Sequence, residues 1–313
     1  MNRLFIIPQL NKSVIAQINN INIQEINQID IPFNSKSVIT ENNLIIALCF
    51  DLKALRIFDI NGMLIDEKLN FNYKSIACEK NIVYFGGEFN IVNLGVEYNN
   101  ESLIFGETFS LIDFEISNFY LIEIDLPIDL IQGKSIDDIL INGNQLVLVD
   151  NVQFPKYMIM YDISTPNNPV HTRTDELPNN GTYEHIIKGD INNNWMVLFS
   201  SSYGERGSSQ YISISGKKEG RLSVYRSRRQ EDSGILSLIF NDICLIDNNL
   251  FILLNDDLGY IDLNEEISIS KFKKIPTKQT DLKRIFKSPD NSLIVISENE
   301  FERVELNNYL LML

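Results

Sequence analysis

The side chains that could do chemistry in this sequence recur at matching places along the chain. An acidic residue follows an apolar residue at the end of several short apolar runs, as in LRIFDI (55–60) and MIMYDI (158–163). The five acids are Asp59, Asp125, Asp162, Asp262 and Glu305. Carboxylates at equivalent positions could bind Ca²⁺ or act as general acids and bases. A turn follows the acid in two of the copies, however, and an acid at that place accepts backbone N–H bonds. We predict that all five are structural turn residues.

Other candidate sites for chemistry lack part of their pattern. DINNNW (190–195) has the D-x-N-x-N spacing of a calcium loop, but Trp195 replaces its glycine and Ser201 stands where its last glutamate belongs. His171 and His185 are the only histidines, and neither has a partner at a zinc-ligand spacing. No G-x-S-x-G or phosphate-binding loop is present. We predict no catalytic, metal-binding or cofactor-binding residues.

The charge of the chain excludes general affinity for nucleic acid. The 313 residues carry a formal net charge of −15, which would repel a phosphate backbone. GKKEGRLSVYRSRR (216–229) is the basic exception. Lys217 and Lys218 precede an apolar run, and Arg226 occupies the place where other copies carry an acid. We predict two small basic groups separated by a strand, which does not make a continuous nucleic-acid groove.

The cysteines and the apolar segments bear on the compartment. Cys49, Cys78 and Cys244 lie far apart, each in or beside an apolar run, which predicts buried reduced thiols. The N-terminal apolar run is interrupted by Pro8 and Lys12, and no segment reaches 18 continuous apolar residues. We therefore expect a cytoplasmic protein with no signal peptide and no membrane span.

Two short patterns repeat along the chain and indicate strands. The first is a polar turn, mostly containing Asn, followed by β-branched and large apolar residues. Its copies are ENNLIIAL (41–48), EKNIVYFGG (79–87), NGNQLVLVD (142–150), INNNWMVLF (191–199), DNNLFILLN (247–255) and PDNSLIVIS (289–297). The second is the acid-ending run, and the distance from Asp59 to Glu305 gives a period of about 49 residues.

This period is typical of four-stranded propeller blades, which bury their faces by stacking on one another. We predict an all-β fold, a single β-propeller domain over residues 1–313. Residues 1–32 hold three more apolar runs, and YLLML (309–313) is another. These ends could form a degenerate seventh blade or close the sixth. We slightly favour seven blades over six, with the ring closed by strands from both termini.

The stretch MYDISTPNNPVHT (160–172) resembles the LVIVD repeat of bacterial β-propellers, in which a strand ending in Asp-Ile-Ser precedes a Pro-Asx-Pro turn. The close similarity covers residues 140–172. It implies propeller architecture and no particular activity, because such propellers serve many roles.

Two repeats are longer than the others. We interpret residues 87–117 and 201–220 as loop insertions between the second and third strands of their blades, on one face of the disc. Candidate partner-binding residues on them are Glu88, Phe89, Tyr98, Phe109, Tyr203, Arg206, Lys217 and Lys218.

The function predicted from these features is binding of another protein without catalysis. The acidic charge favours a partner with a basic surface. The protein would be a scaffold subunit, or an acidic antidote or inhibitor of a basic partner. The alternative is a propeller hydrolase, similar to a lactonase, with polar groups at its central channel. The oligomeric state stays open.

Overall fold

The fold was determined as a computed structural model of the 313-residue chain. The residues it describes are 3–9, 12–19, 22–71, 73–79, 82–87, 91–96, 119–124, 136–150, 157–165, 169–176, 184–204, 207–227, 238–255, 257–297, 300–304 and 306.

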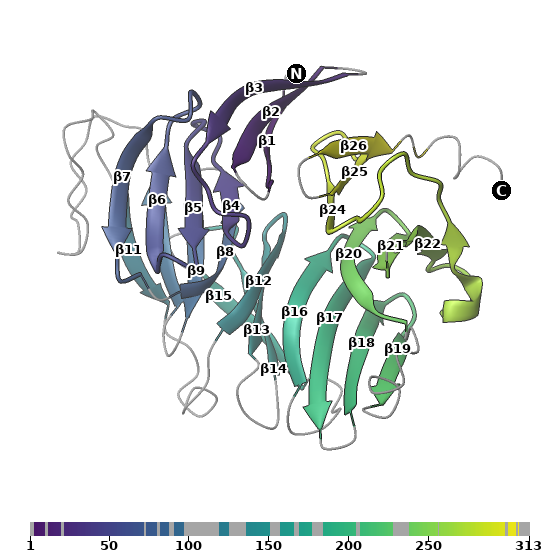
Figure 1. The fold of residues 1–313 in the computed structure, drawn as a ribbon. Coiled ribbons are helices and arrows are strands. Elements are labelled where there is room, and N and C mark those ends of the chain that lie inside the picture. Colours follow the sequence, from purple (N-terminus) through teal and green to yellow (C-terminus); the bar gives the residue numbers. More distant parts are fainter. Residues whose placement is uncertain are drawn as a thin grey trace. The chain divides into compact units, whose positions relative to one another are not determined.

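Regular structure in these residues is β-strand, apart from the short 3₁₀ helix η1 (Ile269–Lys271). Consecutive strands pair with one another to form antiparallel sheets (Figure 1). Within this part of the chain, no helix has the length and apolar character needed to cross a membrane. The N-terminal sheet comprises β1 (Arg3–Ile7), β2 (Ser13–Asn19) and β3 (Asn22–Ile29).

Six further sheets follow, which we number as blades one to six. Blade one comprises β4 (Lys36–Ile39), β5 (Ile45–Cys49), β6 (Ala54–Phe58) and β7 (Leu64–Leu69). Blade two comprises β8 (Tyr73–Glu79), β9 (Ile82–Gly87), β10 (Ile91–Val96) and β11 (Phe119–Ile124). Blade three comprises β12 (Ile136–Asn142), β13 (Gln145–Asp150), β14 (Tyr157–Asp162) and β15 (Val170–Glu176).

The last three blades are built in the same order. Blade four comprises β16 (Glu184–Ile191), β17 (Trp195–Gly204), β18 (Gly207–Gly216) and β19 (Gly220–Ser227). Blade five comprises β20 (Phe240–Ile246), β21 (Asn249–Leu254), β22 (Asp257–Asp262) and β23 (Lys273–Lys274). Blade six comprises β24 (Arg284–Lys287), β25 (Leu293–Ile296) and β26 (Phe301–Val304).

The polar turn of the first sequence repeat has a backbone reason. It joins the first and second strands of a blade, and it places one residue in the left-handed region in four blades. These residues are Asn43 (φ 61°), Gly143 (φ 57°), Asp247 (φ 52°) and Asn291 (φ 64°). Glycine, asparagine and aspartate tolerate this region best, which explains why these residue types occupy the four positions.

The apolar runs form the second strand of each blade and are covered on both faces. Leu250 and Ile252 of β21 pack with Val197 of blade four. Phe251 and Leu253, which alternate with them, pack with Val295 of blade six. All four β21 side chains are fully buried. A strand of this kind can exist only between two neighbouring sheets.

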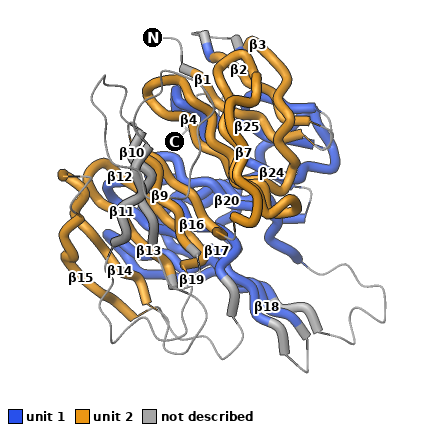
Figure 2. Tube along the Cα trace, turned by 90° about the vertical axis from the view of Figure 1, so that its left-hand side faces the viewer, with its two compact units in different colours: residues 1–3, 18–23, 180–313 blue, residues 4–17, 24–179 orange. Residues whose placement is uncertain are grey.

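The chain divides into two compact units (Figure 2). One consists of residues 1–3, 18–23 and 180–313, and the other of residues 4–17 and 24–179. Consecutive sheets pack through apolar clusters within each unit. In the second unit, Ile46 and Phe85 belong to the cluster between blades one and two, and Tyr84 and Leu148 to that between blades two and three.

The structure has six blades, so the preference for seven is wrong. The three N-terminal runs pair with one another as β1, β2 and β3, and in the described residues no C-terminal strand joins their sheet. They are consecutive in the chain, so pairing among themselves requires closing only short loops. Ile15 and Ile29 of this sheet pack on Phe58 of blade one. Closure of the ring by both termini stays a prediction.

The strand assignment in the two long repeats also differs from expectation. In blade two, β10 lies inside the supposed loop 87–117 and pairs with both β9 and β11, so LIEI (121–124) is the fourth strand. In blade four, residues 201–204 and 207–216 belong to β17 and β18, so LSVY (222–225) is likewise in the fourth strand. The additional residues of the two blades therefore do not occupy the same connection. In blade two they lie between the third and fourth strands.

The cysteines form no disulfide. Cys49 and Cys244 are buried, and burial raises the pKa of both thiols. Cys78 is half-buried, and burial, with Glu79 nearby, raises its pKa to about 12.

These thiols should react only after unfolding. At pH 8 the Cys78 thiolate fraction is about a thousandfold below that of a peptide thiol, since the thiolate is the nucleophile. Titration with a disulfide reagent at pH 8 should therefore give three thiols in guanidinium and none within minutes in the folded state. Fast reaction of Cys78 alone would contradict this.

Gly216 should tolerate no side chain. Its φ is 140°, and a Cβ there would lie 2.1 Å from the carbonyl oxygen of Asn194. We expect Gly216→Ala to lower the free energy of unfolding by about 3 kcal/mol, through backbone strain and the clash. Gly143→Ala is the matched control, because that turn has φ 57° with no atom within 4 Å of an added Cβ; it should cost about 1 kcal/mol. Equal losses in urea denaturation would show that the close approach is unimportant.

Candidate functional site

The repeated acids hold turns in the blades. The Asp59 carboxylate accepts a hydrogen bond from the Met63 amide at 2.8 Å. Asp162 accepts one from the Ser164 amide at 2.8 Å, and Asp262 one from Asn264 at 2.9 Å. Their oxygens therefore stabilise local backbone. Asp125 and Glu305 lie outside the described residues.

Arg226 does not replace one of these acids. Asp162 and Asp262 pair with Gln145 and Asn249, which are the first residues of the second strands β13 and β21. The residue that pairs with the first residue of β17 is Gly216. Arg226 lies one strand further out, paired with Ser208. The strand alignment that placed Arg226 at the acid position was therefore wrong.

Few of the predicted partner-binding side chains can be placed. Glu88, Phe89, Tyr98, Phe109 and Arg206 lie outside the described residues, and Tyr203 is described only as part of β17. Lys217 and Lys218 are exposed in the turn between β18 and β19. Lys218 donates to the backbone carbonyls of Asn264 and Glu265 in blade five. These contacts tie the turn to the neighbouring blade.

Blade four has the longest strands in the described part of the chain and is the candidate functional site. Strands β17 and β18 have ten residues each and pair without interruption from Trp195↔Gly216 to Gly204↔Gly207. Strand β19 continues the sheet with eight pairs. In Figure 2 the end of β18 projects from its unit. We call the outer end of this sheet, residues 200–211 and 223–227 as far as they are described, the blade-four arm.

The two faces of blade four differ in composition. One face carries Ile212, Ile214 and Leu222, which are buried against blade five. The alternate positions of β18 are serines together with Tyr211, all half-buried, and those of β19 include the exposed Arg221 and Ser223. The Arg221 guanidinium lies 3.7 Å from the centre of the Tyr211 ring, which holds this long side chain across the sheet.

Polar contacts hold blade four on blade five. The Gln210 side-chain amide pairs with the backbone of Phe240, donating to its carbonyl at 3.0 Å and accepting from its amide at 2.8 Å. The Trp195 indole N–H donates to Asn248 at 2.9 Å. The two hydrogen bonds of Gln210 are directional, so they fix the base of the arm on blade five.

A β-bulge recurs between the first and second strands of blades two to five. The residue that follows each bulge reaches another blade. These residues are Ser75, Asp138, Lys188 and Asp242. Asp138 forms an ion pair with Lys36 at 2.9 Å, and Lys188 forms one with Asp242 at 2.8 Å.

The Lys188–Asp242 pair joins three blades. Its side chains are 33% and 10% exposed. Asp242 also accepts the backbone amides of Ile243 and, in blade six, Ile285. Burial acts to lower the pKa of Lys188, but Asp242, with Cys244 and Asp190 nearby, outweighs burial and the pKa is raised. The stability that this ion pair contributes is therefore complete below the pKa of about 10.4 that the lysine has in the unfolded chain. It is lost as the pH rises through the folded-state pKa of Lys188.

The calcium-like motif is used as a turn. The two carboxylate oxygens of Asp190 accept the backbone amides of Ile191 and Leu245, and burial raises the pKa of this carboxyl. Asn192 accepts the amides of Asn194 and Trp195. In the described residues, no group of three or more His, Cys, Asp or Glu side chains could hold a metal ion.

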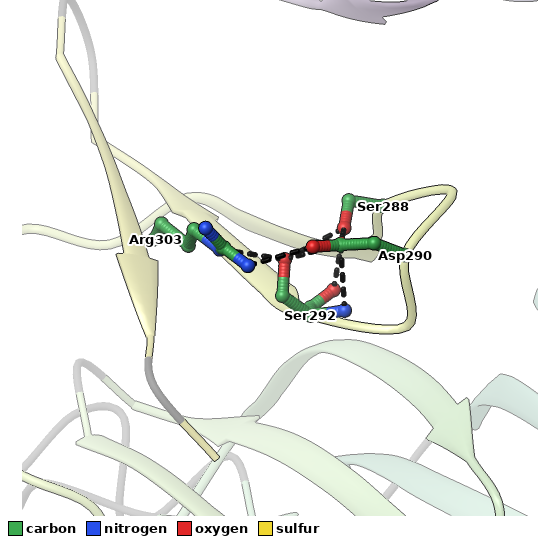
Figure 3. A network of polar contacts seen from close by, with 4 residues as sticks. All are labelled: Ser288, Asp290, Ser292 and Arg303. Atoms are coloured by element: carbon green, nitrogen blue, oxygen red, sulfur yellow. Dashed lines mark hydrogen bonds and ion pairs between the residues drawn. The ribbon is translucent and has the colours of Figure 1, made fainter. Parts of the chain in front are cut away.

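A polar network in blade six resembles catalytic machinery in composition only (Figure 3). Ser288 and Ser292 donate to one oxygen of Asp290, and Arg303 donates to the other at 2.6 Å. Burial acts to raise the pKa of Asp290, but these donors lower it further. A carboxylate with a lowered pKa is a weak base, so it does not activate either serine. The network clamps the turn between β24 and β25 to β26.

Comparisons with known proteins support the fold. No known protein family matches the sequence. No curated protein is similar to it. The β-propeller domain of Cps50 (Swd1) from Myceliophteria thermophila superposes with a TM-score of 0.55 at 7% identity, over 92% of this chain and 88% of that one. A catalytically inactive virginiamycin B lyase from Staphylococcus aureus, solved with quinupristin, gives 0.52 at 10% identity, over 96% and 97%.

At this identity the likeness shows the fold alone. The chain is an all-β propeller of four-stranded blades, and its neighbours are propellers of diverse names. They supply nothing specific to the LVIVD repeat, so that similarity stays a resemblance.

Sequence reasoning missed the Arg221–Tyr211 contact and the Gln210 anchor. The alternation of polar and apolar residues in SQYISIS (209–215) could have revealed a strand with one apolar and one polar face. The partners of Gln210 and Trp195 lie 30 and 53 residues away, beyond any local pattern.

The Lys188–Asp242 pair should be essential to stability. Asp242→Ala leaves Lys188 without its carboxylate and removes an acceptor from two backbone amides, so we expect a loss of about 3 kcal/mol in the free energy of unfolding. The matched control is Asp257→Ala in the same unit. Its pair with Lys274 has side chains 52% and 68% exposed, so this change should cost less than about 0.5 kcal/mol. Comparable losses in urea denaturation would contradict the structural role of the buried pair.

Proposed function

We propose that this protein is a non-catalytic interaction propeller that binds another protein through the blade-four arm. The observation that carries the proposal is the length and composition of that arm. It extends a rigid sheet with strands rich in serine, tyrosine and glycine, the residue types that dominate adaptable binding surfaces.

The rigid support of the arm favours binding. Its base is anchored on blade five by Gln210 and by the apolar face of β18. An element held in this way loses little conformational entropy when a partner docks, which strengthens association.

The charge of the whole chain suggests the character of the partner. A protein with a net charge of −15 attracts basic surfaces and associates with them faster. A scaffold subunit or an antidote that covers a basic partner would both use this property.

A shortened arm tests the proposal. Ser202 pairs with Ser209, so residues 203–208 can be replaced by Asn-Gly, a two-residue turn suited to this register. We expect affinity purification from the native cell, followed by mass spectrometry, to recover one stoichiometric partner with the wild-type chain and to lose it with the shortened arm. Circular dichroism should show unchanged β content.

The matched control changes the corresponding turn of blade one. Lys53 has φ 48°, so Lys53→Gly relaxes the turn between β5 and β6 and should leave capture intact. Absence of any stoichiometric partner, together with a metal-dependent hydrolase activity of the pure protein, would replace the proposal with the lactonase-like alternative.

A further inference from the structure

The outer strands of the blades differ in how well they are protected against pairing with another chain. Sheet edges expose unpaired backbone groups, and proteins guard them with bulges, charges, proline or short length. β7 has a bulge against β6 and carries three consecutive charged residues, and β15 has a bulge against β14. β23 has two residues, with Pro276 soon after.

Of these protections, β19 has only charged side chains, those of Arg221 and Arg226. It is eight residues long, it contains no proline, and its pairing with β18 runs without a bulge from Gly220 to Ser227. None of the other described strands pairs with its outer side. β11 is also free of bulges, but it has six residues and its only charged residue is Glu123. Among the outer strands of the six blades, β19 is thus the longest in the described part of the chain, and its pairing is regular.

The edge of β19 is also basic in an acidic protein. Residues 217–229 contain six Lys or Arg residues and one acid, Glu219. Within the strand, Arg221 is exposed and stacked on Tyr211, and Arg226 lies near the outer end. Positions 221 and 226 are five residues apart, so they lie on opposite faces of the strand. A strand that added to this edge would bring the alternate side chains of one of its faces beside Arg221.

We propose that the free edge of β19 binds an extended acidic segment of a partner protein by β-strand addition. Backbone hydrogen bonds along residues 220–227 would supply affinity, and carboxylates on the face of Arg221 would select acidic sequences. The inference rests on the proposed function and names the chemistry of the segment that the arm binds. The rest of the partner can still carry a basic surface.

A second copy of this chain fits the edge less well. Antiparallel pairing of two β19 strands would set basic side chains against basic side chains, and each copy carries a net charge of −15. The repulsion between basic side chains at the edge and the repulsion between the two net charges both oppose self-association. An acidic segment would instead be attracted by the basic side chains of the edge.

The test uses a synthetic fluorescein-labelled peptide of five Glu-Val repeats and the full-length protein, with fluorescence anisotropy as the readout. We expect it to bind at least tenfold more tightly than the Lys-Val peptide of the same length. A Glu-Val peptide with N-methyl groups on alternate residues keeps its charge but loses backbone donors. The methylated peptide should bind at least tenfold more weakly than the unmethylated Glu-Val peptide. Because only the peptide differs, altered folding of the protein cannot cause this loss.

Two variants locate the site. Arg221→Glu should weaken Glu-Val binding at least fivefold, and Ser223→Pro should do so by disturbing the backbone of the edge, each with an unchanged melting curve. Hydrogen exchange should show new protection at residues 220–227 and none in β7 or β15.

The result that overturns the inference is equal binding of the N-methylated or the Lys-Val peptide, or protection confined to another strand. A dimer that Ser223→Pro dissociates in analytical ultracentrifugation would assign the edge to a second copy and also overturn it. Failure of the peptides while capture from cells still depends on the arm would reject strand addition and leave the proposed function standing.

Discussion

The structure depends on burying the second strand of each blade on both of its faces. Leu250, Phe251, Ile252 and Leu253 alternate in direction, yet all are fully buried. At about 2 kcal/mol for each such side chain, a blade that lost one neighbour would forfeit roughly half of this stabilisation along a single strand. An isolated repeat therefore cannot hold its own core, and the repeats must stack.

Apolar stacking is not directional, so other contacts fix the register of the blades. Left-handed residues such as Asn43 and Asn291 set the turns before the buried strands, and Asp162 and Asp262 hold the turns after the third strands. The bulged first strands then send single polar side chains to other blades. Lys188 and Asp242 show why these contacts must be complete. Each is partly removed from water, and each is satisfied by the other together with the backbone of Ile285.

Blade four follows the same rules inside and departs from them outside. Its inner face joins the apolar cluster with blade five, whereas β18 and β19 extend the sheet with serine, tyrosine and arginine. A sheet edge is also a binding surface, so the devices that guard β7, β15 and β23 make the plain edge of β19 informative. Blade four is therefore the best candidate for binding, because its described strands are the longest and the edge of β19 has no bulge or proline. The described carboxylates of the repeat are weaker candidates, because their oxygens already accept hydrogen bonds in turns and ion pairs.

The sequence by itself determined the local features. The six apolar strands follow from continuous runs of β-branched and large apolar residues between turns. The turn role of acids such as Asp59 follows from side chains that bond a few residues away. Tertiary structure alone decided which strand pairs with which. LIEI and LSVY read like the acid-ending runs of other repeats, but pairing across β10 and β18 makes them fourth strands, and the N-terminal runs pair with one another instead of adding a seventh blade. The same holds for Arg221 on Tyr211 and for Lys188 with Asp242. These contacts join residues 10 and 54 positions apart, and only the folded sheets bring them together.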